Sequence, residues 1–250
     1  MKNDIGFLSS LSIIVPAYKA ESFIVPSLVE IEKVVREYAK SYEIICVVDG
    51  KVDKTYDLAN NLAKKSGKIK VLGYQKNRGK GYAVRFGMAK ARGEIVGFID
   101  AGLEIDPSSL RELIKVQKNE DADIVVGSKR HPKSRVTYPT IRKIISIFYY
   151  YLVKILFNLE ISDTQAGVKI FKKKVIETVF PKLRIDGFAF DIEILTLSKL
   201  SGFGKIFEAP IYVRMVKTEK SSTLDSMTKV LMASMRMFYD TIYLYLRLKL

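Results

Sequence analysis

Two acidic side chains stand four residues apart directly after a short apolar run. Asp100 follows the run Ile95–Ile99, and Glu104 precedes a predicted helix that starts at Pro107. Carboxylate oxygens gathered in one loop are the ligands that Mg²⁺ or Mn²⁺ takes when it is held against a diphosphate. A structural alternative stays open, in which Asp106 caps the helix and the other two acids are only solvated.

A second group with possible chemistry is the sequence Asn77-Arg-Gly-Lys-Gly81. Glycine and lysine at the start of a helix suit a phosphate group. The sequence is not a Walker loop, because five residues separate Gly73 from Gly79. It is not a dinucleotide fingerprint either, because Val84 stands where the third glycine belongs. Taken alone, it is also compatible with an ordinary tight turn.

These residues need a framework, and apolar runs alternate with helical stretches through the first half of the chain. The predicted strands are Leu11–Val15, Glu43–Asp49, Ile69–Tyr74, Glu94–Asp100 and Asp123–Gly127. The predicted helices are Ser22–Lys40, Thr55–Lys65, Lys80–Ala91 and Pro107–Lys118. This alternation predicts an α/β fold with a mostly parallel central sheet flanked by helices. Ligands bind beyond the carboxyl ends of such strands, where the acids and the Gly-Lys loop lie.

The second half of the chain has a different pattern. We predict strands at Gly167–Phe171 and Ile206–Val213 and a helix over Asp191–Leu200. Ile141–Leu159 is strongly apolar, and Thr223–Leu250 predicts one or two helices rich in Met, Leu and Tyr. Without an internal repeat or a low-complexity linker, one domain over residues 1–250 is expected, with parts at 1–130, 131–222 and 223–250.

The composition of the chain indicates more about its binding partners than about its fold. The formal charge of +15 suits phosphates in nucleic acid, nucleotides or anionic lipid headgroups. The single cysteine, Cys46, excludes an internal disulfide, and its apolar neighbours predict a buried thiol. The first ten residues are too poor in apolar length for a signal peptide, so a cytoplasmic protein is expected unless another segment touches a membrane.

The joint order of these motifs resembles the family 2 glycosyltransferases. The resemblance is carried by Ile14-Val-Pro-Ala-Tyr-Lys-Ala-Glu21, Val48-Asp-Gly-Lys-Val-Asp-Lys-Thr55, the stretch from Asn77 to Gly87, and Val126-Gly-Ser-Lys-Arg130. It implies a glycosyltransferase A-type fold, a nucleoside-diphosphate sugar donor bound by residues 1–130, and a divalent metal, Mg²⁺ or Mn²⁺. It places the donor against Pro16, Ala17, Tyr18, Glu21, Asp49, Lys80, Asp100 and Ala101, and the metal on Asp100 and Glu104.

Within that family, the second half resembles the dolichyl-phosphate mannose and glucose synthases. Asp163-Thr-Gln-Ala-Gly-Val-Lys-Ile-Phe171 and Gly187-Phe-Ala-Phe-Asp-Ile-Glu193 carry this likeness. It implies that residues 131–222 bind a polyprenyl (dolichyl) phosphate acceptor. Asp163, with Asp191 and Glu193, is then expected to orient acceptor-side cations or sugar hydroxyls. A helix cap is the alternative for Asp191 or Glu193.

Two departures from the family pattern bear on activity. The D-x-D motif is written Asp100-Ala-Gly102 here, so its second acid is missing, and Glu104 is interpreted as a partial replacement. Weak metal binding, or loss of activity, is a possible consequence. A basic C-terminal motif of the relatives is blurred, so Lys217, Lys220 and Ser222 are assigned only loosely to a phosphate-facing loop.

The acceptor prediction also depends on the helix predicted over Ile141–Leu159. Its length is near the lower limit for a membrane span, and its lysine, arginine and tyrosines favour an interfacial helix, with a buried core helix as the alternative. A basic stretch leads into it and would hold a lipid phosphate. The candidate acceptor residues are Ser128, Lys129, Arg130, Arg142, Lys217, Lys220 and Ser222, and the candidate catalytic residues are Asp100, Asp163, Lys129 and Arg142.

Together these features predict an inverting transfer of a hexose from UDP-glucose or GDP-mannose to a polyprenyl phosphate. The protein is expected to be peripheral at the cytoplasmic face of an anionic membrane, with no nucleic-acid partner. Residues 223–250 are predicted to form amphipathic helices that serve as a surface anchor or as a contact within a homo-oligomer. The alternatives are an inactive nucleotide-sugar binder, motivated by Gly102, and a nucleic-acid-binding protein, motivated by the charge.

Overall fold

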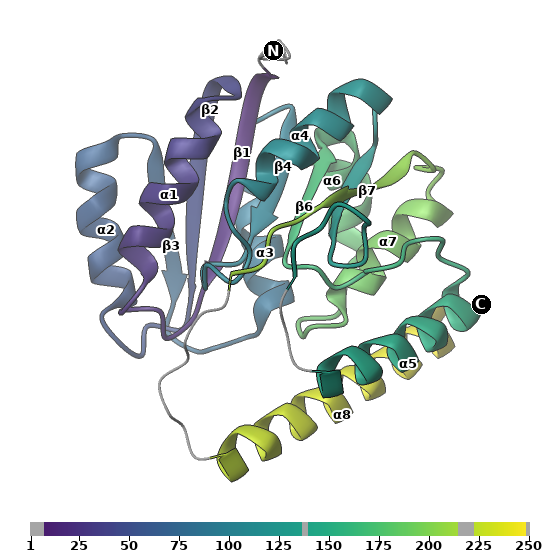
Figure 1. The fold of residues 1–250 in the computed structure, drawn as a ribbon. Helices are drawn as coiled ribbons and strands as arrows, with labels where there is room; N and C mark the ends of the chain where they lie inside the picture. Colours follow the sequence, from purple (N-terminus) through teal and green to yellow (C-terminus); the bar gives the residue numbers. More distant parts are fainter. Residues whose placement is uncertain (1–7, 137–139, 215–222, 249–250) are drawn as a thin grey trace.

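The computed structural model describes residues 8–136, 140–214 and 223–248. A seven-stranded sheet with strand order β3-β2-β1-β4-β6-β5-β7 forms its centre (Figure 1). The strands are β1 (Leu8–Ala17), β2 (Ala39–Asp49), β3 (Ile69–Tyr74), β4 (Ile95–Ile99), β5 (Ile124–Ser128), β6 (Val168–Lys172) and β7 (Ile206–Pro210). The predicted mostly parallel α/β sheet is confirmed, and β6 alone runs antiparallel to its neighbours β4 and β5.

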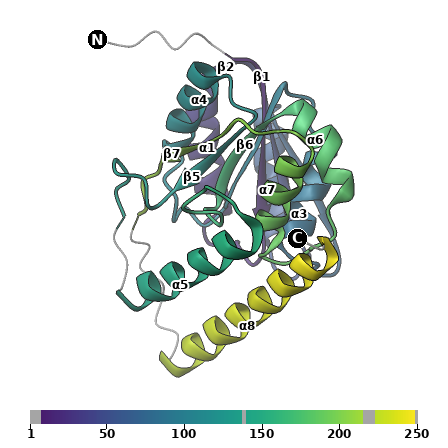
Figure 2. The same cartoon turned by 90° about the vertical axis from the view of Figure 1, so that its right-hand side faces the viewer.

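Helices cover both faces of the sheet and create two apolar cores (Figures 1 and 2). One face carries α1 (Ile24–Arg36), α2 (Thr55–Ser66) and α4 (Ser109–Glu120). The other carries α3 (Lys80–Met88), α6 (Lys173–Val179), the 3₁₀ turn η1 (Phe180–Lys182) and α7 (Phe190–Leu200). The strands between them are buried on both sides, which explains their nearly continuous apolar sequences.

The antiparallel direction of β6 is a finding that the sequence did not predict. The backbone N–H of Asp100, at the carboxyl end of β4, donates to the carbonyl of Gly167. The chain therefore enters β6 from the edge where the parallel strands end, instead of crossing back to their amino ends first. This entry brings the segment from Asp163 to Gly167 to the same edge of the sheet as the predicted donor residues.

Three local predictions can be compared with the structure. Helix α1 ends at Arg36 and not at Lys40, because Ala39 already begins β2. Helix α4 begins at Ser109, two residues after Pro107, and the Asp106 carboxylate accepts the Ser108 N–H at 2.8 Å. Cys46 is buried as predicted, and burial raises the pKa of its thiol to about 12.

Helices α5 (Thr140–Phe157) and α8 (Thr223–Leu248) lie side by side beside the sheet (Figures 1 and 2). Val153 and Phe157 of α5 and Leu244 of α8 join the second core, and the hydroxyls of Tyr149 and Thr241 are 2.6 Å apart. Residues 223–248 form one long helix. In the described part of the chain, no helix combines the length and the hydropathy that a membrane crossing requires.

Candidate active site

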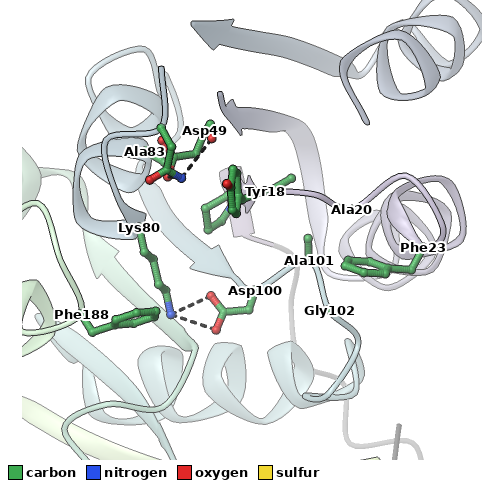
Figure 3. A pocket seen from close by; sticks show the side chains of 13 residues that line it. Tyr18, Ala20, Phe23, Asp49, Lys80, Ala83, Asp100, Ala101, Gly102 and Phe188 are labelled. Atoms are coloured by element: carbon green, nitrogen blue, oxygen red, sulfur yellow. Dashed lines mark hydrogen bonds and ion pairs between the residues drawn. The ribbon is translucent and has the colours of Figure 1, made fainter. Parts of the chain in front are cut away.

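A cavity of about 440 Å³ opens at the carboxyl ends of β1, β2 and β4 (Figure 3). These strands are neighbours in the sheet, so the loops that follow them meet at one place. Its lining comprises Pro16, Ala17, Tyr18, Ala20, Phe23, Asp49, Asn77, Lys80, Ala83, Asp100, Ala101, Gly102 and Phe188. Most of the predicted donor residues are therefore brought together, while Glu21 is not among the lining residues.

The carboxylate of Asp49 is the anchor of the loop that enters α3. Its Oδ1 accepts the Tyr74 hydroxyl at 2.9 Å and the Arg78 N–H at 2.7 Å. Its Oδ2 accepts the Asn77 side-chain amide at 2.8 Å and the Gly79 N–H at 3.0 Å. Burial and the bond to Asp49 both raise the pKa of Tyr74, so this hydroxyl stays a donor at neutral pH. Asp49 lies on the cavity wall, but protein donors already occupy both of its oxygens.

Four backbone N–H groups of this loop are used within the protein. Those of Arg78 and Gly79 go to Asp49, and those of Gly81 and Tyr82 go to the carbonyl of Asp186, at 2.8 and 3.4 Å. A Cβ at Gly79, where φ is +105°, would lie 2.5 Å from the same carbonyl. The loop is thus not a cradle of free amides. What it presents to the cavity is the side chain of Lys80.

Lys80 and Asp100 form an ion pair at the wall of the cavity (Figure 3). The Lys80 ammonium lies 2.7 Å from Oδ1 of Asp100 and 2.9 Å from Oδ2. Burial acts to lower the pKa of Lys80, but the charges of Asp100 and Asp191 outweigh it and raise that pKa. The ammonium also lies 5.5 Å from the centre of the Phe98 ring. The site therefore holds a permanent cation, with the half-exposed Asp100 carboxylate beside it.

Gly167 shapes the position of Asp100. The Asp100 N–H donates to the Gly167 carbonyl at 2.9 Å, and a Cβ on Gly167 would lie 2.0 Å from the Asp100 carboxylate. No side chain fits there without moving Asp100. Position 167 of the Asp163–Phe171 motif therefore requires a glycine for steric reasons. In the sequence, only the place of this glycine within the motif indicated the requirement.

A buried ion pair lies close to Phe98, and its ammonium group is 5.3 Å from the centre of that ring. Lys169 on β6 is fully buried and donates to Asp191 Oδ1 at 2.5 Å and to the Ala166 carbonyl at 2.9 Å. Asp191 is 2% exposed. Burial lowers the pKa of Lys169 and raises the pKa of Asp191, so each charge depends on the other. Asp191 is therefore a structural partner of β6 and makes no side-chain cap hydrogen bond at the start of α7.

Three of the candidate acceptor residues, Ser128, Lys129 and Arg130, lie at the carboxyl end of β5, outside the lining of this cavity. Asp163 is buried, and its Oδ2 accepts the Lys129 N–H at 2.9 Å and lies 3.7 Å from the Lys129 ammonium. Ser128 is also buried and contacts the Ser162 hydroxyl at 3.1 Å. The Arg130 guanidinium lies 4.7 Å from the ring centre of Tyr150, which joins this loop to α5.

The remaining candidates are placed as follows. Glu21 accepts the Lys54 N–H at 3.1 Å, and Glu104 is exposed, with its carbonyl accepting the Arg214 N–H. Among the described residues, no group of three or more His, Cys, Asp or Glu side chains is arranged to hold a metal. The Arg142 side chain and the residues Lys217, Lys220 and Ser222 lie outside the described part.

The lining residues that were missed as individual contacts are Ala20, Phe23, Asn77, Ala83, Gly102 and Phe188. Phe188 follows Gly187 in the second-half motif, far in sequence from the strand-end loops that form the rest of the wall. An aromatic residue in a loop carries no periodic signal that would indicate a ligand. The close approach of Phe190 on α7 to Gly81 on α3 brings the neighbouring Phe188 to the cavity.

Known proteins resemble this chain in sequence and in fold. The model of glycosyl transferase family 2 matches residues 12–180. The dolichyl-phosphate beta-glucosyltransferase of Dictyostelium discoideum is 35% identical over 204 residues, covering 76% of this chain and 62% of that protein. The human dolichyl-phosphate beta-glucosyltransferase is 30% identical over 228 residues, covering 84% of this chain and 68% of that protein. The chain thus spans less than two thirds of the length of the first of these relatives.

Solved structures add the fold. Glucosyl-3-phosphoglycerate synthase from Mycobacterium tuberculosis, crystallised with Mn²⁺, UDP-glucose and phosphoglyceric acid, superposes with a TM-score of 0.68 at 17% identity. The superposition covers 95% of this chain and 80% of that one. The predicted glycosyltransferase A-type fold is thereby confirmed.

Replacing Lys169 with methionine tests the buried ion pair. The change leaves the Asp191 carboxylate buried without its cation, and the free energy of unfolding is expected to fall by about 3–5 kcal/mol. Urea denaturation measures it. Lys172→Met is the control, because this lysine lies on the same strand and pairs at the surface with Asp121. Equal stability of the two variants would contradict the assigned role of Lys169.

Proposed function

The chain belongs to glycosyl transferase family 2, and on that premise we propose that it transfers glucose from UDP-glucose to a dolichyl or similar polyprenyl phosphate. The observation that carries the proposal is the Lys80–Asp100 pair in a cavity at the strand ends. The names of the relatives favour glucose over mannose as the transferred sugar. UDP-glucose in the neighbouring synthase structure favours a uridine donor.

The donor is proposed to lie in the 440 Å³ cavity with its base and ribose against the ends of β1 and β2. Pro16, Ala17 and Tyr18 form that wall, with Asp49 behind them. The diphosphate then reaches the Lys80 ammonium, which is the cation that the loop presents. A positive charge held at the leaving group stabilises the developing negative charge without reorganisation during the reaction.

We propose that a divalent ion, Mg²⁺ or Mn²⁺, binds beside Asp100. The Asp100 side chain is 42% exposed toward the cavity, and such ions are commonly held by one or two carboxylates together with substrate phosphates and water. Glu104, two residues beyond Gly102, is exposed and is the second proposed ligand. When bound, the ion would help to neutralise the leaving diphosphate. The D-x-D position offers only one carboxylate, that of Asp100. Lys80 is therefore proposed to provide much of the positive charge that neutralises the leaving diphosphate.

The acceptor is proposed to approach from the side of α5 and α8. Phe148 and Ile155 on α5 and Tyr239 on α8 are 72%, 79% and 71% exposed. Large exposed apolar side chains on two adjacent amphipathic helices are typical of a surface that lies in a membrane interface. The net charge of +15 adds attraction to anionic lipid. We infer a peripheral location at the cytoplasmic face of a membrane.

In the proposed reaction a phosphate oxygen of the acceptor attacks the anomeric carbon, and the bond from that carbon to the UDP oxygen breaks. The attacking oxygen is already an anion, so no proton has to be removed by a strong base. The chain has to align the two substrates and hold the departing UDP. Lys129 and Arg130 are proposed to hold the acceptor phosphate, with Asp163 fixing Lys129 through its carboxylate. Attack opposite the leaving group inverts the configuration.

One observation favours a second candidate function. Gly102 removes the second acid of the metal motif, which would suit a protein that binds a nucleotide-sugar without turning it over. The first test therefore measures turnover directly. With a short-chain prenyl phosphate, the protein is expected to release UDP from UDP-glucose faster than GDP from GDP-mannose. Binding of UDP without release from any donor would support the inactive binder instead.

Asp100→Asn is expected to lower the turnover number by at least about a hundredfold, because the carboxylate that orients Lys80 and faces the metal becomes neutral. The release of UDP in the presence of prenyl phosphate measures the effect. Asp57→Asn, an exposed carboxylate in the first turn of α2, is the control and should retain wild-type turnover. Wild-type turnover in Asp100→Asn would contradict the placement of the chemistry in this cavity.

Gly102→Asp is expected to tighten Mn²⁺ binding by about tenfold or more, because it restores a second carboxylate. Nothing lies within 4 Å of a Cβ at this position, so the side chain fits. Electron paramagnetic resonance of free Mn²⁺ measures the affinity without any need for turnover. Gly204→Asp is matched, since its Cβ also has open space, and it should not change the affinity. Equal affinities in the two variants would exclude a metal at Asp100.

The double change Ile155→Glu with Tyr239→Glu is expected to abolish sedimentation with phosphatidylcholine–phosphatidylserine vesicles, because two charges then occupy the apolar face. Val29→Glu on α1 replaces another exposed apolar residue on a different helix and serves as control. Light scattering of the same variants reports the oligomeric state. The result could instead be a wild-type dimer that does not sediment with vesicles and a double variant that is monomeric. That result would favour a dimer contact over a membrane surface.

A further inference from the structure

The loop from residue 183 to residue 188 holds the start of α3 from behind. The Asp186 carbonyl accepts the N–H groups of Gly81 and Tyr82, and the Asp186 carboxylate pairs with Arg85. Arg85 also donates to the Leu183 carbonyl at 2.7 Å. Because Lys80 is the first residue of α3, the position of this loop sets where the Lys80 ammonium stands in the cavity.

The same loop is fixed from its other side by a buried carboxylate. Glu193, in the first turn of α7, is fully buried, and its two oxygens accept the N–H groups of Arg184 at 2.9 Å and Ile185 at 2.8 Å. Its charge is met by Arg247 of α8, whose Nη2 lies 2.6 Å from Oε1. A carboxylate buried this deeply needs such a cation.

Helix α8 also contacts the end of the loop that faces the cavity. Phe188 lines the donor cavity and, on its other side, a second hollow of about 260 Å³ formed with α8. Met232, Met237 and Asp240 contribute the α8 wall of that hollow. A Cβ on Gly187 would lie 2.8 Å from the Asp240 carboxylate, so helix and loop are in close contact there.

We propose that Arg247 is a positioning residue for the donor site. Through Glu193 it holds the 183–188 loop, and this loop sets both the start of α3 and the place of Phe188. Without the guanidinium, the Glu193 carboxylate is buried and uncompensated, so it must turn toward water or take up a proton. Either change weakens its bonds to the Arg184 and Ile185 N–H groups. The inference rests on the proposed function only in naming UDP as the ligand.

A fluorescent reporter can follow the loop directly, because the chain contains no tryptophan. Phe188→Trp introduces a single indole into the loop, 55% exposed at that position in the native chain. Adding Arg247→Met to this background is expected to shift the indole emission to longer wavelength, because the loop moves toward solvent. Arg247→Lys retains a cation and should restore most of the native emission.

Calorimetry in the native background measures the consequence for binding. Arg247→Met is expected to weaken UDP affinity by about tenfold, as a displaced Lys80 loses one charge-assisted contact. Arg111→Met removes an arginine that pairs with Glu37 at the surface, 3.2 Å apart, and should leave affinity and emission unchanged. The melting temperature of each variant separates a folded protein with a shifted loop from an unfolded one.

The outcomes decide between the possibilities. Native emission and native UDP affinity in a folded Arg247→Met variant overturn the proposal. If that variant does not fold, Arg247→Gln takes its place with the same expected directions, and unchanged values there overturn it as well. The emission arm needs no nucleotide. If the wild type binds neither UDP nor GDP, the proposed function fails, while the emission still decides the role of Arg247.

Discussion

The candidate site depends on the hydrogen bonds that the Asp49 carboxylate accepts. Four donors from the end of β3 and the loop that follows it converge on this carboxylate: the Tyr74 hydroxyl, the Asn77 side chain, and the N–H groups of Arg78 and Gly79. Asp49 is itself the last residue of β2, so the loop is fastened to the sheet. Hydrogen bonds to an ionised acceptor are stronger than neutral ones, and Asp49, which accepts these four, is itself buried, with only 4% of the residue exposed. The direction in which α3 leaves the loop, and hence the position of Lys80, follows from this anchor.

Two ion pairs at the cavity lie close to Phe98. Lys80 and Asp100 face the cavity, and the buried pair Lys169 and Asp191 lies deeper. Both lysine ammonium groups lie over the Phe98 ring, at 5.5 and 5.3 Å from its centre. The deeper pair is expensive to bury, and it places fixed charges beside the cavity. Asp191 adds to the field that keeps Lys80 protonated.

The second half of the chain supports the donor cavity more than it contributes residues to the cavity lining. Gly167 allows Asp100 to sit against β6, and Glu193 fastens the loop that backs α3. Through Arg247, that support reaches α8, whose outer face is apolar and exposed. The donor cavity and the face proposed to meet the membrane are thus joined by one loop and one buried ion pair. A substitution far from the cavity can therefore act on the donor.

The sequence by itself determined the fold class, the edge of the sheet where ligands bind, and most of the residues that line the cavity. Those properties follow from local patterns: buried strands give apolar runs, and polar residues directly after them must lie at the carboxyl edge. The tertiary structure alone decided which polar groups remain free there. Asp49 accepts hydrogen bonds from the loop amides, and Asp191 pairs with Lys169. Glu193 accepts hydrogen bonds from two backbone N–H groups and from Arg247. The direction of β6 and the approach of Phe188 were also tertiary outcomes. Hydrogen-bond partners far apart in the chain leave no periodic trace in sequence, because their pairing depends on how the elements pack.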